Sequence, residues 1–574
     1  MSMNNNKKRS TFFRCIKMAF GIMPRHFSAM LLIHIILAFL PLLGMQQSRK
    51  IYHFAQMSLS SFLPAIKIAF PFFIYTCYLL LMKVYVVYYQ RVAVQFGGLL
   101  EFEKKAKLML HKKCDHINMN LYETPSFYNS LWEAKVASIN IYRLVECAIS
   151  LLCVSINILL MSGYAGTIHP SFFAFVVLTA VPALVEKVFA AILRNRRRSE
   201  LTQLSKVERA RRECLTGISY AKERLVYNSF PFLFKKWKDA AISLLDKDYM
   251  VSKQVLRMGT VLNTIKAAST AGIYILAVWL FSKNKIDFAD FMIAISTTLH
   301  LQTQYAELFS DVGYFSEFQM MVKPYFRFMD MDIDIVASTP NSSESIKFNN
   351  VGFSYPTSSK AVLHSLNFGI NSGEKVAIVG LNGAGKTTIS KLLAGLLHPT
   401  SGTIDGQLLS SCVMFQDYQK YELTLKENIA INETIPSMPE KIDQLINEMG
   451  IGDIPDGIIL GREFGKTDLS GGQWQKVAMA RLYYHGGKTL VLDEPTSSID
   501  PIYEKGLNDL ILEKANNGKT LVVISHRLSI AKLVDRIFVL ENGTIVEQGS
   551  HKMLIRDSGS HYAKLWAAQT SWYE

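Results

Sequence analysis

The stretch that decides the fold is Glu374-Lys-Val-Ala-Ile-Val-Gly380-Leu-Asn-Gly-Ala-Gly-Lys386-Thr387-Thr388. Its first six residues, EKVAIV, contain the apolar run VAIV and predict a buried strand, and a helix is expected to begin at Lys386. The glycines between them let backbone N–H groups wrap phosphate oxygens at a helix N-terminus. Lys386 would neutralise the phosphates, and the Thr387 hydroxyl would face Mg²⁺. The stretch therefore predicts an α/β nucleoside triphosphatase, without saying of which type.

Five further motifs indicate which type of nucleoside triphosphatase this is. Two of them lie in the middle of the C-terminal half. The sequence VMFQD, residues 413–417, predicts a strand followed by Gln416, which is placed to reach a metal ion and an attacking water. The sequence LSGGQ, residues 469–473, opens a helix that we expect to begin at Trp474. A helix start with two glycines is a second place where backbone N–H groups can bind a phosphate.

The other three motifs supply acid–base and metal chemistry. The sequence LVLDEP predicts a strand whose Asp493 holds Mg²⁺ through water, with Glu494 beside it as general base. Asp500 ends the sequence SID that follows, and His526 ends the strand-like sequence VVISH, where it can contact a γ-phosphate. The site thus contains what phosphoryl transfer to water requires, namely positioning, charge neutralisation and a base.

These motifs, in this order, resemble the ATP-binding cassette (ABC) transporter family, and the resemblance covers essentially the whole chain. It implies a head-to-tail dimer in which ATP bound at Lys386 of one copy is completed by Ser470 and Gly472 of the other. Tyr355 lies 25 residues before Gly380, where the family places an aromatic ring on adenine; the alternative for this ring is ordinary strand packing. Because no motif is degenerate, a homodimer would have two competent sites.

The resemblance assigns roles to the following residues. The catalytic residues are Glu494, His526 and Gln416, and the residues near Mg²⁺ are Thr387, Gln416 and Asp493. The nucleotide-binding residues are Tyr355, Gly380, Leu381, Asn382, Gly383, Ala384, Gly385, Lys386, Thr387, Thr388, Ser470, Gly471, Gly472, Gln473 and Asp500.

The N-terminal half differs sharply, because it alternates long apolar runs with basic stretches. Six runs approach or exceed the roughly 20 residues that cross a bilayer: 27–44, 62–89, 144–164, 171–193, 258–281 and 288–308. The last is interrupted by Asp290, His300, Gln302 and Gln304, and a polar face on a span is typical of a cavity lining. Before the first run, basic and apolar residues alternate from Lys7 to Phe20, which predicts an amphipathic helix on the membrane surface.

The distribution of Lys and Arg predicts the orientation of these spans. The N-terminal arm carries six, residues 90–143 eight and residues 194–257 sixteen, whereas the three short connections carry four together. By the positive-inside rule, both long connections and both termini are cytoplasmic. The formal charge of +15 therefore reflects membrane topology, and we expect no nucleic-acid partner.

The two long connections exceed the length of ordinary loops. We expect membrane helices that continue into the cytoplasm and turn back through short transverse helices, at residues 122–132 and 221–237. In one interpretation these turns press on the ATPase; in the other they are solvated helical hairpins.

The sequence therefore predicts a multidomain protein: an all-α, six-helix transmembrane domain (residues 1–330), a linker (331–344) and an α/β ABC domain (345–574). The resemblance is to exporters, and specifically to bacterial exporters of lantibiotics and related modified peptides. It implies ATP- and Mg²⁺-dependent export across the bacterial cell membrane by a homodimer. A multidrug or lipid exporter is the alternative, and a cassette protein acting on DNA or ribosomes is disfavoured by the six apolar runs.

Overall fold

The structure is a computed structural model that describes residues 11–60, 65–85, 88, 97–115, 117, 119–122, 124–331, 345–356, 358, 360–406, 411–433, 435–461, 469–497, 501–516 and 518–570. The chain divides into two compact units. The helical unit comprises Met1–Cys114 and Ser130–Met331, and the α/β unit comprises Asp115–Asn129 and Asp332–Glu574. The predicted linker lies almost wholly outside the described residues. Residues 115–129 group with the α/β unit, a feature that the predicted boundaries do not contain.

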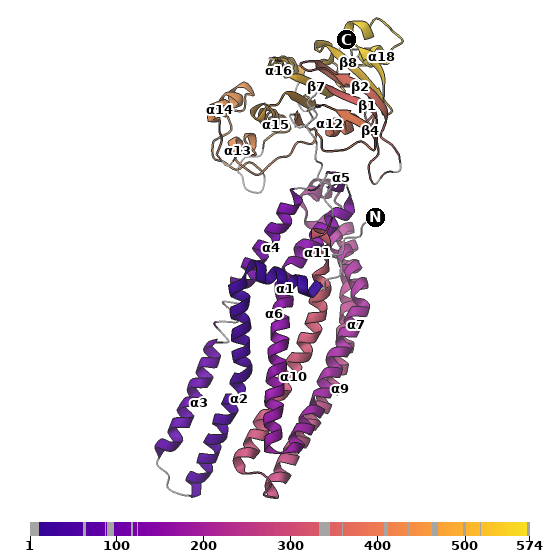
Figure 1. The fold of residues 1–574 in the computed structure, drawn as a ribbon. Helices are drawn as coiled ribbons and strands as arrows, with labels where there is room; N and C mark the ends of the chain where they lie inside the picture. The colour runs from indigo at the N-terminus through magenta and orange to yellow at the C-terminus, as the bar shows by residue number, and fades with distance from the viewer. Residues whose placement is uncertain are drawn as a thin grey trace. The chain divides into compact units, whose positions relative to one another are not determined.

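Every regular element in the described part of the helical unit is a helix (Figure 1). A proline stands at the first or second position of several of them, where its fixed φ favours helix initiation and its missing N–H has no helical partner anyway. The helices are α1 (Thr11–Ile22), α2 (Pro24–Ser60), α3 (Ala65–Tyr85), α4 (Leu99–Cys114), α6 (Pro125–Ile168), α7 (Pro170–Thr216), η3 (Ile218–Tyr220), α8 (Ala221–Val226), α9 (Phe230–Ser282), α10 (Phe288–Met321) and α11 (Lys323–Met329).

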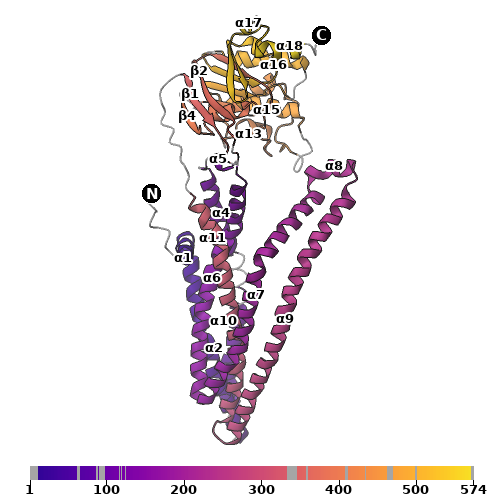
Figure 2. The same cartoon turned by 90° about the vertical axis from the view of Figure 1, so that its right-hand side faces the viewer.

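The six predicted spans fall within or largely overlap α2, α3, α6, α7, α9 and α10. Three stretches of the described helices are long and apolar enough to cross a membrane: Pro24–Phe54, Ser126–Ile168 and Phe230–Ser282. The helices of the second half of the unit exceed a bilayer span, since α6, α7 and α9 have 44, 47 and 53 residues. Figure 2 shows α7 and α9 running side by side, with the short α8 between their ends.

The last predicted span contains polar side chains that pair with neighbouring helices. On α10, His300 Nε2 lies 3.0 Å from Asn157 Oδ1 of α6, and Gln302 Nε2 donates to Thr270 Oγ1 of α9 at 2.6 Å. Asn157 in turn donates to the Ala38 carbonyl of α2 at 2.8 Å. These polar groups therefore join four helices, because apolar surroundings offer them no water to bond.

The α/β unit contains two sheets. A three-stranded antiparallel sheet has the order β2 (Leu363–Ile370), β1 (Ile346–Phe353), β4 (Ser401–Asp405). A six-stranded sheet has the order β5 (Ser411–Met414), β6 (Thr489–Asp493), β7 (Thr520–Ser525), β3 (Lys375–Val379), β8 (Arg536–Glu541), β9 (Thr544–Gly549), parallel except for the final pair. The helices are α5 (Met119–Tyr122), α12 (Lys386–Leu393), α13 (Leu425–Ile429), α14 (Pro439–Glu448), α15 (Gly471–His485), α16 (Pro501–Lys514), η4 (Ala531–Leu533), α17 (His551–Leu554) and α18 (His561–Thr570).

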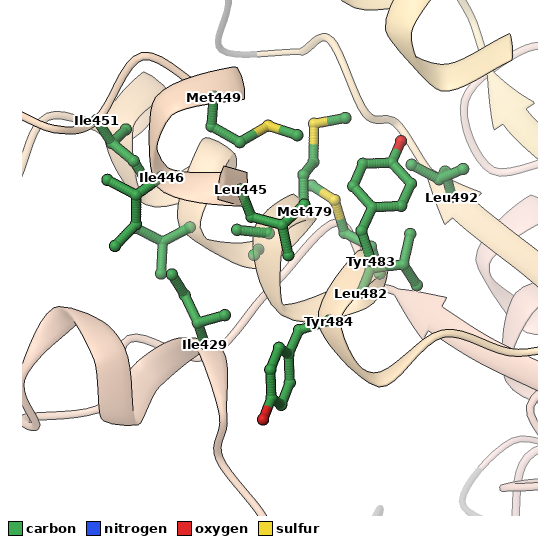
Figure 3. Close-up of a cluster of buried hydrophobic side chains, with 14 of the residues drawn as sticks. Ile429, Leu445, Ile446, Met449, Ile451, Met479, Leu482, Tyr483, Tyr484 and Leu492 are labelled. Atoms are coloured by element: carbon green, nitrogen blue, oxygen red, sulfur yellow. The ribbon is translucent and has the colours of Figure 1, made fainter. Parts of the chain in front are cut away.

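The core of this unit is built around its apolar strands, whose side chains are buried on both faces of the sheet. One buried cluster joins α13, α14 and α15 to β6, with Met449, Met479 and Leu492 among its side chains (Figure 3). It fixes α15 relative to the sheet. The predicted fold class, a helical transmembrane domain followed by an α/β domain, is confirmed.

Candidate active site

The carboxyl ends of four adjacent parallel strands meet at one edge of the six-stranded sheet, where ligands of open α/β sheets bind. The chain leaves β5 toward Gln416, β6 toward Glu494, β7 toward His526 and β3 toward Gly380. Residues that are more than 100 positions apart in the sequence therefore gather at one edge of the sheet.

The loop between β3 and α12 has backbone angles that only glycine adopts without strain at two positions. Gly383 and Gly385 have φ values of 83° and 104°. At Gly380, a Cβ atom would lie 2.2 Å from the Leu540 carbonyl oxygen. Ala384 is buried, and its carbonyl accepts a hydrogen bond from the Gly543 N–H at 3.1 Å. The loop thus runs tightly over the sheet, and Leu381 and Asn382 are exposed at its tip.

Lys386 is buried at the start of α12. Its Nζ donates to the carbonyls of Gly380 and Leu381 at 2.9 and 3.0 Å. Burial lowers the pKa of Lys386, while the nearby carboxylates of Glu494 and Asp493 raise it. The ammonium group is therefore held inside the loop, where an anionic phosphate would compensate for its lost hydration.

Asp493 lies at the end of β6 with 1% exposure. Its Oδ2 accepts a hydrogen bond from Ser390 Oγ of α12 at 2.9 Å, whereas Oδ1 is buried without a hydrogen-bond partner in the described part of the chain. Burial raises the pKa of Asp493 to about 6. A buried carboxylate oxygen of this kind fits a hard cation such as Mg²⁺.

The rest of a magnesium site would come from neutral oxygens and from the nucleotide. Among the described residues, no three His, Cys, Asp or Glu side chains gather as a metal site. Mg²⁺ commonly uses one or two protein oxygens together with phosphates and water. Thr387, Gln416 and Asp493 therefore suit a cation that arrives with its nucleotide.

Glu494 is held from both sides. Gln416 Nε2 donates to its Oε2 at 2.9 Å, and His526 Nδ1 lies 2.9 Å from its Oε1. The Glu494 N–H donates to the Ile524 carbonyl at 2.8 Å, and its φ is 52°. A left-handed conformation is costly for glutamate and persists where the surroundings enforce it, typically at functional sites. The structure thus brings the three predicted catalytic residues together.

The predicted second phosphate-binding segment forms the exposed start of α15. The helix begins at Gly471, three residues before the predicted Trp474. Ser470 and Gln473 form a reciprocal capping box, in which Ser470 Oγ accepts from the Gln473 N–H at 3.2 Å. Within the described part of the chain, no hydrogen bond links residues 470–473 to Lys386, Asp493 or Glu494.

Tyr355 follows β1, and its hydroxyl lies 3.2 Å from Thr388 Oγ1. Its half-buried ring packs edge-on against Phe353, with the centroids 5.0 Å apart. The hydroxyl contact links Tyr355 to α12, and the ring packs against β1. Both predicted roles, strand packing and stacking on adenine, are compatible with this position. Asp500 lies outside the described residues.

Two polar residues at the site were missed by the sequence analysis. Ser390 is the partner of Asp493, and buried Gln475 of α15 donates to the Glu494 carbonyl at 3.2 Å. Both are polar residues at positions that face a buried apolar side of a helix. That pattern could have indicated them, because a buried polar group needs a partner.

Comparison with known proteins agrees with this geometry. The profile described as "ABC transporter" matches residues 363–497, which include the loop at Lys386, Gln416, the start of α15 and Glu494. The chain carries the ATP-binding domain of ABC transporters. The complete chain also has the fold of an ABC exporter: it aligns with the structure of a bacterial Atm1-family ABC exporter with ATP bound over 98% of this chain and 99% of that one, with a TM-score of 0.74 and 21% sequence identity.

Two curated relatives are lantibiotic transporters. The chain is 27% identical to the subtilin transport ATP-binding protein SpaT of Bacillus subtilis over 79% of its own length and 78% of that protein. It is 33% identical to the nisin transport ATP-binding protein NisT of Lactococcus lactis subsp. lactis, over 39% of this chain and 40% of that one. The resemblance to lantibiotic exporters noted in the sequence is therefore confirmed, and the chain is a membrane protein with an ABC ATPase domain.

Proposed function

We propose that this chain is a half-transporter that works as a homodimer in the bacterial cell membrane and uses ATP hydrolysis to export a modified peptide. The observation that carries this proposal is the arrangement of Glu494 between Gln416 and His526, next to Lys386 and Asp493. One chain thus supplies the base, the phosphate-binding lysine and a metal-binding carboxylate, in an exporter fold.

In the proposed reaction, water attacks the γ-phosphorus of ATP. The bond from that phosphorus to the β–γ bridging oxygen breaks, ADP and phosphate form, and Glu494 accepts the proton of the water. Gln416 orients the carboxylate of Glu494, and His526 is placed to contact the γ-phosphate. When bound, Mg²⁺ would neutralise phosphate charge, held by Thr387, Gln416 and Asp493. Lys386 balances the charge of the β- and γ-phosphates.

A second copy is needed to complete each site. The exposed start of α15 offers backbone N–H groups at a helix N-terminus, and within the described part of the chain no hydrogen bond links these groups to Lys386. Head-to-tail pairing would place Ser470 and Gly472 of the partner on the γ-phosphate. The same pairing would give the exposed apolar side chains at the end of α8 a surface to bind, since Leu225, Val226 and the C-cap residue Tyr227 are 75–78% exposed.

Coupling between hydrolysis and transport is proposed to pass through the segment that contains α5. Met119 of α5 lines a hollow of about 640 Å³ in the α/β unit, together with Phe415, Tyr418, Arg481 and His485. Phe415 and Tyr418 flank Gln416 in sequence, so a shift of Gln416 on nucleotide binding would change the walls of this hollow. This turn lies earlier than the predicted 122–132, because Phe127, Tyr128 and Trp132 already belong to α6.

The peptide cargo is proposed because two relatives are subtilin and nisin transport proteins. These relatives do not identify a cargo, since the chain is also 37% identical to the ABC multidrug transporter MDR5 of Trichophyton rubrum over 39% of this chain and 19% of that protein. A multidrug or lipid exporter is therefore the alternative. We propose that both termini are cytoplasmic, as the distribution of basic residues predicts.

The test is ATPase activity of the purified full-length protein in liposomes, with lantibiotic precursor peptides, amphipathic drugs and lipids added separately. We expect ATP- and Mg²⁺-dependent hydrolysis that precursor peptides stimulate, with uptake of peptide into inside-out vesicles. The Glu494→Gln variant is the matched control without hydrolysis. Stimulation and uptake by drugs or lipids only would establish the alternative, and absence of hydrolysis would refute the proposal.

A further inference from the structure

The C-terminal helix α18 contacts the loop that carries His526. Gln569 Nε2 donates to the His526 carbonyl, and Gln569 Oε1 accepts a hydrogen bond from the Leu528 N–H at 3.0 Å. A single side-chain amide thus bonds the backbone on both sides of Arg527, which sets the direction of the chain just after the histidine. None of the motifs of the ATPase site includes this residue.

Gln569 is well placed for this contact because α18 is itself fixed. Tyr562, Leu565, Trp566 and Gln569 follow the spacing i, i+3, i+4, i+7, so they share one face of the helix. Tyr562 is fully buried, its hydroxyl lies 2.8 Å from His551 Nδ1, and its N–H donates to Glu547 Oε2 at 3.0 Å. The apolar side chains of this face pack in one cluster with Leu528. The face therefore ends in a polar residue aimed at the backbone beside His526.

The opposite side of the same loop is held by α16. Glu504, which is buried, accepts hydrogen bonds from Arg527 Nη1 at 2.9 Å and from Ser529 Oγ. The loop from His526 to Ser529 is thus attached on two sides. The imidazole of His526 lies 2.9 Å from Glu494 Oε1. Gln569 bonds the backbone that positions this imidazole at the His526 carbonyl and the Leu528 N–H, and Ser525 Oγ accepts from the Arg527 N–H between them at 2.9 Å.

We propose that Gln569 is a positioning residue for ATP hydrolysis, which acts by orienting the backbone of His526 toward Glu494 and the γ-phosphate. The proposal rests on the proposed function of His526. It assigns a role in the reaction to the C-terminal helix.

The test compares kcat and KM for ATP in the full-length protein and three variants. Gln569→Ala removes both hydrogen bonds and should lower kcat about tenfold, the fold-change that corresponds to about 1.4 kcal/mol. KM for ATP should stay within about twofold, because Lys386 and its loop bind the phosphates. Gln569→Glu keeps the acceptor for Leu528 and loses the donor to His526, so its kcat should lie between those of the alanine variant and the original protein.

Thr570→Ala is the matched control, because the Thr570 hydroxyl bonds only to Trp566 and Ala567 carbonyls of its own helix among the described contacts. It should leave kcat unchanged. Thermal unfolding of each variant separates positioning from stability. A kcat per folded molecule that is unchanged in Gln569→Ala would overturn the proposal, as would equal losses in Thr570→Ala.

Amide hydrogen exchange supplies a readout that needs no hydrolysis. The Leu528 amide should exchange at least about tenfold faster in Gln569→Ala than in the original protein, and unchanged exchange would overturn the proposal. If the original protein failed to hydrolyse ATP, the proposed function would be refuted, while the exchange result would still decide whether Gln569 orients this loop.

Discussion

Replacing Asp493 by asparagine should stabilise the nucleotide-free protein while impairing its use of Mg²⁺. In the folded protein, burial raises the pKa of Asp493 to about 6, whereas an aspartate in an unfolded chain has a pKa of about 3.9. The difference of about two pKa units corresponds to about 3 kcal/mol by which the ionised carboxylate destabilises the fold above pH 6. An asparagine amide is nearly isosteric and carries no charge.

The net gain is smaller than this figure. Asp493 Oδ1 is buried without a partner in the described residues, so an amide N–H₂ at that place would leave a buried donor unpaired, at about 1–2 kcal/mol. We therefore expect Asp493→Asn to gain about 1–2 kcal/mol at pH 7.5, or about 3–6 °C in the unfolding temperature of a unit of this size. Between about pH 6 and pH 4 the gain should shrink, because the folded protein already binds the proton there.

The assay is thermal unfolding of the full-length protein in detergent, without nucleotide, from pH 4.5 to 8. Addition of Mg²⁺ and ATP should then raise the unfolding temperature of the original protein more than that of the variant. Asp453→Asn, at an exposed position, is the control that removes the same charge without removing a buried one. A variant that is no more stable than the original protein at pH 7.5, or a difference that does not change with pH, would refute the reasoning.

Three further changes test the other parts of the site. Glu494→Gln should leave ATP binding intact, because the amide keeps the shape of the side chain, and should cut hydrolysis about 10²- to 10⁴-fold through loss of the base; phosphate release at the original rate would remove Glu494 from that role. Lys386→Ala should weaken ATP binding about 10- to 100-fold, measured by titration with a fluorescent nucleotide, because a charged hydrogen-bond donor is lost; unchanged affinity would contradict this. Met119→Asp should keep basal ATPase activity and lose cargo stimulation and transport, since a carboxylate would enter the hollow that Met119 lines, whereas Met119→Leu should behave like the original protein; normal transport by the aspartate variant would make the α5 segment a passive turn.

The strands that lead to the site residues could be predicted well from the sequence. The four apolar runs before Gly380, Gln416, Glu494 and His526 are short, three of them are rich in Val, Ile and Leu, and each is followed by a residue with a distinctive chemical role. Parallel pairing then brings their ends to one edge of the sheet. The sequence also indicated the helical unit, because apolar runs of about 20 residues are typical of membrane-spanning helices.

Contacts made by single polar side chains could not be predicted in the same way. Ser390, Gln475 and Gln569 each bond a site residue that is at least 19 positions away, and nothing local in the sequence marks their partner. The turn at α5 was also placed too late. Pro125 was correctly taken as a helix start, but the aromatic residues after it belong to α6 and not to the turn. Phe127 is almost fully buried there, whereas Tyr128 and Trp132 are exposed.

The length of α9 has a mechanical consequence. Its 53 residues form a rod of about 80 Å, at 1.5 Å per residue, and its only proline is Pro231 in the first turn, where it does not kink the helix. A rod of this kind amplifies rotation, so that a tilt of about 1° at one end displaces the other end by about 1.4 Å. Small adjustments among the side chains at the α8 end of α9 would therefore become large displacements at its opposite end.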